Sequence, residues 1–373
     1  MSHKLFIICG EPSGDLHGAN LIEELKKSDP KIEIQCWGGD KMAAAGGRVM
    51  KHIDELAFMG FVEVLLNIRA ILQNFKLCKG HISTFNPDAV LLIDYPGFNL
   101  RMAKHIYEMG IPVHYYISPQ IWAWKESRVK KIKAYIQRVF VILPFESDFY
   151  KKHGVEAEFV GHPLLDELNK HHYDTDLFKA NHELNPDMKV VAFLPGSRSQ
   201  EIKRMLPLAN ELATKLSGHQ FVVSKVHWHP ESLYRLMLKD NIKLVEGDTY
   251  DLIRSSEVCV VTSGTATLET ALIGTPQVVV YKSDPISVRI ARWLIKIKYI
   301  SLVNLIMDEM VVRELIQEEA SVANLEKELL SIMTGGDKRQ QVLDKYQQLQ
   351  QILGSGGASK IVATRLLKSM EAT

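Results

Sequence analysis

Short apolar runs alternate with longer amphipathic segments along most of this 373-residue chain. The apolar runs are rich in Val, Ile and Leu without a polar face, which is typical of parallel strands covered on both sides of a sheet. The segments between them carry a helical period, so the pattern predicts alternating strands and helices. In the first half we expect strands at residues 5–9, 34–37, 89–93, 113–117, 139–143 and 158–160.

The alternation stops in a polar stretch, residues 163–187, which we interpret as an inter-domain connection. It restarts with strands at 190–194, 220–224, 242–245, 257–262 and 277–281, and only helical patterns follow about residue 322. The pattern predicts an α/β protein with two Rossmann-like domains, 1–165 and 166–350. A C-terminal helical tail, 351–373, is expected to pack back on the first domain. Ligands should bind at the carboxyl ends of the strands.

Composition narrows the functional classes. Forty-five basic and 44 acidic residues nearly cancel, so no overall field favours nucleic acid. The four cysteines form no C-x-x-C pair, which predicts buried free thiols rather than disulfides or a metal site. We find no signal peptide and no apolar stretch of the roughly 20 residues that span a bilayer. We therefore expect a cytoplasmic protein that meets a membrane only at its surface.

Two strand ends in the second half have the character of anion sites. Leu194-Pro195-Gly196-Ser197-Arg198 leads into a helix, and an arginine fork beside free helix N–H groups suits a diphosphate. The alternative is an ordinary surface arginine. The second turn comprises Thr262-Ser263-Gly264-Thr265, with Glu269 one helical turn further on, where it could accept hydrogen bonds from ribose hydroxyls. The alternative is a plain helix cap.

Three strand ends in the first half could carry an acceptor and the chemistry. Asp94 ends an apolar strand, where a carboxylate could remove a proton from a hydroxyl or could simply cap the next helix. The glycine-rich turn, residues 9–15, and the tryptophan turn, residues 118–125, could each contact a ligand. The alternative for the first is a capped strand-to-helix turn, and the alternative for the second is buried packing. The candidate residues of the two turns are Gly10, Ser13, Gly14, Asp15, Trp122 and Trp124.

Two further patterns match sequence motifs of metal-binding sites. Asp174-Thr175-Asp176 matches D-x-D but lies in the polar connection, and His227-Trp228-His229 has no third ligand nearby in sequence. We expect neither to bind metal.

Wide apolar helical faces with basic residues, at 61–75 and 286–298, are typical of helices that lie on anionic lipid. The residues expected to contact the membrane are Phe61, Val64, Leu65, Ile68, Arg69, Leu72, Arg289, Arg292 and Trp293.

At this point the chain resembles the lipid-A-disaccharide synthase family, which joins two acylated glucosamines in lipid A biosynthesis. The resemblance covers nearly the full length of the chain. Besides the turns quoted above, the resemblance rests on Met59-Gly60-Phe61-Val62-Glu63-Val64, Ile93-Asp94-Tyr95-Pro96-Gly97-Phe98-Asn99, Ser118-Pro119-Gln120-Ile121-Trp122-Ala123-Trp124, Leu143-Pro144-Phe145-Glu146, Gly161-His162-Pro163 and Tyr299-Ile300-Ser301-Leu302-Val303-Asn304.

The resemblance implies a GT-B fold, two facing domains, and an inverting glycosyl transfer that requires neither metal nor cofactor. The donor would be UDP-2,3-diacylglucosamine and the acceptor 2,3-diacylglucosamine 1-phosphate, at the cytoplasmic face of the inner membrane. Asp94 would be the general base, Arg198 would neutralise UDP, Glu269 would hold the ribose and Asn304 would lie near the nucleotide. Oligomeric state and acyl-chain preference stay open, with a homodimer as one alternative.

Two departures concern the motif around Asp94. Familiar members read Asp-Ala-Pro-Asp-Phe-Asn there, whereas this chain has Tyr95 and Gly97, so a second carboxylate is lost. Two other functions share the predicted architecture. A UDP-sugar 2-epimerase would need no acceptor, and a nucleotide-sugar sensor would bind UDP without transfer.

Overall fold

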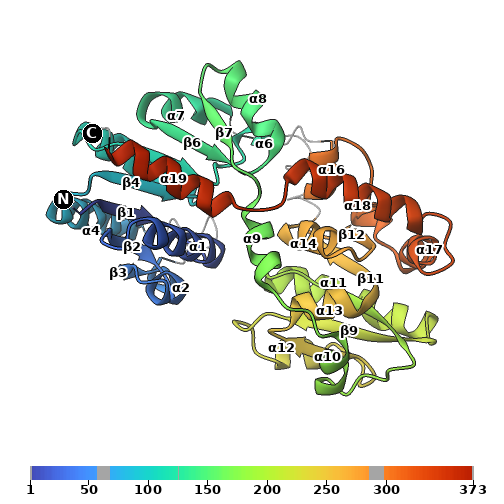
Figure 1. The fold of residues 1–373 in the computed structure, drawn as a ribbon. Helices are drawn as coiled ribbons and strands as arrows, with labels where there is room; N and C mark the ends of the chain where they lie inside the picture. Colours follow the sequence, from blue (N-terminus) through green and yellow to red (C-terminus); the bar gives the residue numbers. More distant parts are fainter. Residues whose placement is uncertain (1, 57–67, 125, 285–297, 372–373) are drawn as a thin grey trace. The chain divides into compact units, whose positions relative to one another are not determined.

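The computed structural model describes residues 2–56, 68–124, 126–284 and 298–371 (Figure 1). The chain divides into two compact units. Unit 1 contains residues 1–167 and 353–373, and unit 2 contains residues 168–352.

Unit 1 is built on a parallel sheet of seven strands whose two faces are both covered by helices. Across the sheet the strands are β3 (Arg48–His52), β2 (Glu33–Gly38), β1 (Lys4–Ile8), β4 (Ala89–Ile93), β5 (Val113–Tyr116), β6 (Arg138–Val141) and β7 (Ala157–Phe159). The helices are α1 (Pro12–Ser28), α2 (Asp40–Ala44), η1 (Ile53–Glu55), α4 (Ile68–Phe85), α5 (Pro96–Glu108), α6 (Ile121–Trp124), η2 (Glu126–Arg128), α7 (Val129–Tyr135), α8 (Pro144–Lys152), α9 (Pro163–Lys170), which crosses into unit 2, and α19 (Ala358–Glu371).

Alternate residues of the central strands enter two separate cores, as the pleat requires. Phe6 and Ile8 of β1 pack with α4, α5 and α7, whereas Leu5 and Ile7 pack with α1 and α19. Helices α1 and α19 lie beside each other although they come from opposite ends of the chain (Figure 1). The last helix is therefore an integral layer of unit 1.

Unit 2 repeats the scheme with a six-stranded parallel sheet. Its strands are β10 (Lys243–Glu246), β9 (His219–Lys225), β8 (Lys189–Leu194), β11 (Ser256–Thr262), β12 (Gln277–Tyr281) and β13 (Glu314–Ile316). Its helices are α10 (Thr175–Asn181), α11 (Ser199–Lys215), α12 (Ser232–Arg235), α13 (Thr249–Ser255), α14 (Thr265–Ile273), α16 (Leu302–Met307), η3 (Gln317–Glu319), α17 (Val322–Ile332) and α18 (Arg339–Leu353).

The structure confirms the predicted α/β class and parallel sheets, and differs from the sequence pattern in three places. Strands β3 and β13 were not predicted, because β3 is a half-exposed edge strand and β13 has only three residues. The polar stretch after Pro163 is largely helical, since α9 and α10 occupy it and Phe178 of α10 is buried. The helical pattern at residues 231–239 predicts nine helical residues, but α12 ends at Arg235.

Candidate active site

The carboxyl ends of β1, β4, β5 and β6 meet at one edge of the unit 1 sheet, because the strands are parallel neighbours. Asp94 directly follows β4 and has a φ of 41°, and Tyr95 follows with a φ of 51°. Both lie in the left-handed region, which side chains other than glycine rarely adopt. Such strain persists only where the surroundings impose it, and here it marks the Asp94 turn as a functional candidate.

Hydrogen bonds from two elements hold the Asp94 backbone. Its carbonyl accepts from the Tyr115 hydroxyl at 2.6 Å and from the Asn99 amide at 2.7 Å, and its N–H donates to the Tyr116 carbonyl. The N-cap of α5 is Tyr95, so the alternative that Asp94 caps this helix is wrong. The Asp94 side chain is left half-buried at the sheet edge.

Burial raises the pKa of the Asp94 carboxyl to about 6, and the nearby negative charge of Glu11 adds to the effect. A hydrogen bond from the Tyr95 backbone acts in the opposite direction. A base with a pKa close to the working pH suits proton transfer. Glu11, the exposed N-cap residue of α1, was not among the candidates, although its place between Gly10 and the helix could have indicated it.

The Tyr95 ring packs directly against Gly10. A Cβ on Gly10 would lie 2.4 Å from the ring, so only glycine fits at that position. The ring also stacks on Phe98, with 5.5 Å between the ring centroids. Gly10 is therefore explained by packing, as is Gly14, where a Cβ would lie 2.8 Å from the Cβ of Cys9.

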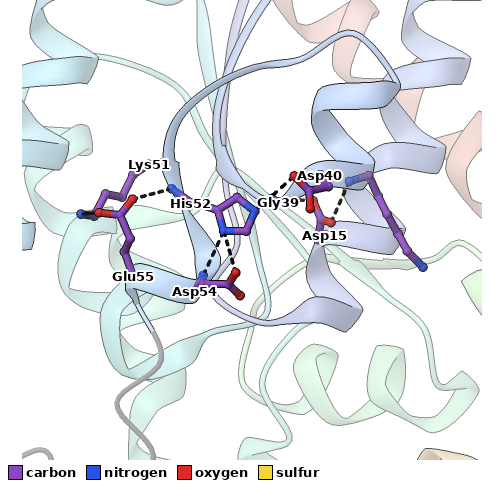
Figure 2. A network of polar contacts seen from close by, with 8 residues as sticks. Asp15, Gly39, Asp40, Lys51, His52, Asp54 and Glu55 are labelled. Carbon is purple, nitrogen blue, oxygen red and sulfur yellow. Dashed lines mark hydrogen bonds and ion pairs between the residues drawn. The ribbon is translucent and has the colours of Figure 1, made fainter. Parts of the chain in front are cut away.

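Asp15 has a structural role that the sequence did not reveal. Its buried carboxylate accepts the N–H groups of Gly39, Lys41 and Met42, and so caps α2 from another helix. Figure 2 shows Asp15 beside Gly39. Neither Asp15 nor Ser13 caps α1. Both Asp15 oxygens accept hydrogen bonds from the protein and the residue is buried, whereas Ser13 is exposed at the same turn.

Trp122 is tied to a buried acid, Glu146. The Trp122 indole N–H donates to Glu146 at 3.1 Å, and the Ser118 hydroxyl and the Leu143 N–H donate to the same carboxyl group. Burial raises the Glu146 pKa to about 7 despite these donors. The indole N–H is thus used in folding, and only the half-buried ring face could meet a ligand. The Trp124 side chain lies outside the described residues.

In unit 2, the turn between β8 and α11 presents Arg198. Gly196 has a φ of 95°, which glycine adopts without strain, and Arg198 is the N-cap residue of α11. Its side chain is 76% exposed and pairs with Glu201 of the same helix. Arg198 therefore stands at the helix N-terminus, where an anion would be stabilised.

A second helix N-terminus lies at the same sheet edge, since β11 neighbours β8. Gly264 is the N-cap of α14 and provides no side-chain cap, and the Ser263 hydroxyl donates instead to the Ile300 carbonyl. No side chain of this turn therefore caps α14. Gly264 and Thr265 are exposed, so their backbone groups can be reached by a ligand. Burial raises the pKa of Glu269, further along α14, to about 7.

Asn304 is fully buried and its amide is saturated. Its nitrogen donates to the Val312 carbonyl and to Glu314, and its oxygen accepts the N–H groups of Val311 and Val312. The expectation that its side chain contacts the nucleotide is therefore not supported by these contacts. Asn304 instead fixes the loop that leads into β13.

The remaining sequence candidates are the two metal-like patterns, the cysteines and the residues expected to contact a membrane. Asp174 caps α10, and the part of the chain that the structure describes holds no group of three residues able to bind a metal. All four cysteines are buried and free, as predicted. Arg69 is exposed and Leu72 of α4 is 62% exposed. The other membrane candidates lie outside the described residues, apart from Ile68, whose side chain is not described: Phe61, Val64, Leu65, Arg289, Arg292 and Trp293.

No described helix is long and apolar enough to cross a bilayer. Among solved structures, the chain is similar to UDP-GlcNAc 2-epimerase from Neisseria meningitidis bound to UDP-GlcNAc, with a TM-score of 0.69 and 16% identity over 98% of this chain and 100% of that one. It is similarly related to the glycotransferase of kitacinnamycin, with a TM-score of 0.67 and 12% identity over 99% of each chain. At these identities the likeness shows the fold, which confirms the predicted GT-B class.

The sequence comparisons are more specific. The chain is 38% identical to the lipid-A-disaccharide synthase of Syntrophus aciditrophicus over 100% of both chains. It is 37% identical to that of Coxiella burnetii over 97% of this chain and 98% of the relative. A family model described as lipid-A-disaccharide synthetase matches residues 5–362. The chain therefore belongs to the lipid-A-disaccharide synthase family of glycosyltransferases.

Proposed function

We propose that this chain transfers 2,3-diacylglucosamine from UDP to the 6-hydroxyl of 2,3-diacylglucosamine 1-phosphate, with Asp94 as the general base. The Asp94 carboxylate takes the proton of the 6-hydroxyl as that oxygen forms a bond to the anomeric carbon. The bond from this carbon to the diphosphate breaks at the same time, and UDP leaves with the electron pair. Attack opposite the leaving group inverts the centre and yields a β-1,6 linkage.

The observation that carries the proposal is the state of Asp94. Its pKa of about 6 leaves it mostly ionised near neutral pH but more basic than an ordinary aspartate. The Tyr115 and Asn99 donors hold its backbone, so the carboxyl group is attached to a fixed, strained turn. A strained and pre-positioned carboxyl group at a strand end is expected of a base, whereas an ordinary helix cap would not require it.

Unit 2 supplies groups suited to UDP. The exposed guanidinium of Arg198 would neutralise the diphosphate as charge develops on it. The backbone of Gly196, Ser197, Ser263, Gly264 and Thr265 would complete the nucleotide contacts. Glu269 has no hydrogen-bond partner among the described residues, and ribose hydroxyls would provide donors to it.

The acceptor side would use the exposed Ser13 and the half-buried Trp122 ring face. Acylated substrates lie in a membrane, so we place the enzyme at the cytoplasmic face of the inner membrane, bound from the surface. Exposed Leu72 beside Arg69 on α4 supports this placement, since an apolar and a basic side chain together suit anionic lipid. Assembly as a homodimer would be compatible with this function.

The test supplies both lipid substrates to the purified chain and measures disaccharide and UDP. We expect Asp94→Asn to lower kcat by about 10²–10⁴-fold with UDP affinity unchanged, because only proton removal is lost. Asp88→Asn is the matched control, since Asp88 lies at the opposite end of β4 and accepts the Lys4 N–H. Full turnover by Asp94→Asn would remove the assignment of the base.

A parallel reaction without acceptor separates transfer from the alternatives. A 2-epimerase would convert UDP-GlcNAc in that reaction, and a sensor would bind UDP but form no product even when acceptor is added. Donor consumption that depends strictly on the acceptor supports transfer.

A further inference from the structure

The anion site at the start of α11 already contains a carboxylate of the protein itself. Glu201, three residues into the helix, accepts the Arg198 backbone N–H at 3.2 Å through Oε2. Its Oε1 pairs with the Arg198 guanidinium at 3.4 Å. The backbone donor and the side-chain cation that a phosphate would use at this turn are thus both held by Glu201.

The carboxylate also covers the backbone of the turn. A Cβ built on Gly196 would lie 2.5 Å from Glu201 Oε2, so the carboxylate rests where the glycine leaves room for close approach. Glu201 is only 17% exposed, whereas the Arg198 side chain is 76% exposed. A phosphate that contacts this glycine and the Arg198 N–H would therefore need the space of the Glu201 carboxylate.

The backbone of the Gly196–Arg198 turn is held by side chains of the loop after β9. The Ser197 carbonyl accepts from the Trp228 indole N–H at 3.3 Å and lies 3.0 Å from the His229 ring nitrogen Nε2, which donates when it carries the proton. These contacts set the plane of the Ser197–Arg198 peptide and hence the direction of the Arg198 N–H. The Glu201 side chain, by contrast, can move by rotation about its own single bonds.

We infer that the Glu201 carboxylate occupies the phosphate position at this turn when UDP is absent. The UDP diphosphate displaces the carboxylate on binding, and the carboxylate returns to the Arg198 donors as UDP leaves. The inference rests on the proposed function, because it requires UDP at this turn. The negative charge of Glu201 repels the UDP diphosphate, so Glu201 weakens the binding of UDP and favours its release. The fixed Ser197 backbone keeps Arg198 in place during the exchange.

The inference is tested by calorimetric titration of the full chain with UDP, with inorganic diphosphate as a competitor. Glu201→Gln removes the charge and keeps the shape, and should bind UDP about two- to fivefold more tightly, the range expected for loss of one exposed ion pair. Glu201→Ala should also bind UDP more tightly. In the transfer assay, inhibition by UDP should strengthen by the same factor.

The matched control is Glu231→Gln, which breaks a pair of the same kind between Glu231 and Arg235 at 2.8 Å on α12 and should leave UDP affinity unchanged. Circular dichroism and thermal unfolding verify that each variant is folded. If Glu201→Gln and Glu201→Ala bind UDP equally or more weakly while Arg198→Ala also weakens it, Glu201 positions Arg198 and the inference is overturned. If Arg198→Ala leaves UDP affinity intact, the diphosphate site in the proposed function is itself wrong.

Discussion

At the scale of single residues, Asp94 depends on neighbours that are distant in sequence. Glu11 follows β1 and Asp94 follows β4, and these strands are hydrogen-bonded neighbours, so two carboxyl groups come to one sheet edge. Like charges disfavour ionisation of each other, and burial acts in the same direction on Asp94. The basicity of Asp94 is therefore a property of the fold rather than of its own motif.

A change at Glu11 should move the pH dependence of transfer. Glu11→Gln removes a negative charge that raises the Asp94 pKa, so this pKa falls and the base becomes ionised at lower pH. We expect the acidic limb of kcat/KM, near pH 6 in the parent, to shift to lower pH. The measurement is kcat/KM across pH 4.5–8, roughly the range over which such a group titrates.

Glu24→Gln on the same helix is the control for this experiment, because Glu24 pairs with Lys27 and is not among the charges that act on Asp94. An unchanged or upward-shifted limb in Glu11→Gln would show that Glu11 does not act on the base.

At the scale of elements, helix ends are held by carboxylates in two different ways. Asp174 accepts the Leu177 N–H and caps its own helix, α10, at the surface. Asp15 lies inside α1 and caps α2, so it joins two elements across a buried contact (Figure 2). Removing a buried acceptor leaves its donors without partners, which costs more than losing an exposed cap.

Alanine at these two positions should therefore destabilise the protein unequally. We expect Asp15→Ala to lower the free energy of unfolding of unit 1 by about 2–4 kcal/mol, and Asp174→Ala to lower that of unit 2 by about 1 kcal/mol. Urea unfolding followed by circular dichroism and by hydrogen exchange assigns each loss to its unit. Equal losses would contradict the structural role given to Asp15.

At the scale of the whole molecule, unit 1 is completed by the C-terminal end of the chain. Val362, Ala363 and Leu366 of α19 are buried in one core with residues of α1 and the sheet. Asp166 accepts the N–H groups of Gly357 and Ser359 at 2.5 and 3.0 Å, which fixes the start of α19 close to the point where the chain first leaves unit 1.

A chain that ends at Ile352 should consequently lose unit 1 rather than only a tail. Without α19 the apolar surface of α1 is exposed, and the buried side chains of Val362, Leu366 and Met370 are lost. Each large apolar side chain removed costs about 1.5–3 kcal/mol, so the total is comparable with the stability of a typical domain. Hydrogen exchange should show rapid exchange throughout residues 2–167 and retained protection in the unit 2 sheet. Protection of β1 and β4 equal to that of the full chain would contradict this prediction.

The sequence determined much of this protein by itself. The alternation of apolar runs and helical segments specified the parallel α/β architecture, because strands covered on both faces must be apolar throughout. Candidate turns such as 94–97 and 194–198 were found because parallel strands gather their carboxyl ends at one edge. The ordered motifs indicated the family, which the full-length comparisons show.

The tertiary structure decided what the side chains at those edges do. Asp15 and Asn304 stand in motifs that the sequence marks as candidate sites, yet their side chains hydrogen-bond within the protein. These bonds depend on partners 24–27 residues away for Asp15 and 7–10 for Asn304. Glu11, Glu146 and Glu201 gained their significance only from neighbours, because burial and charge act through space. A sequence specifies where chemistry can be placed, whereas the hydrogen-bond partners of each group decide which groups remain free to perform it.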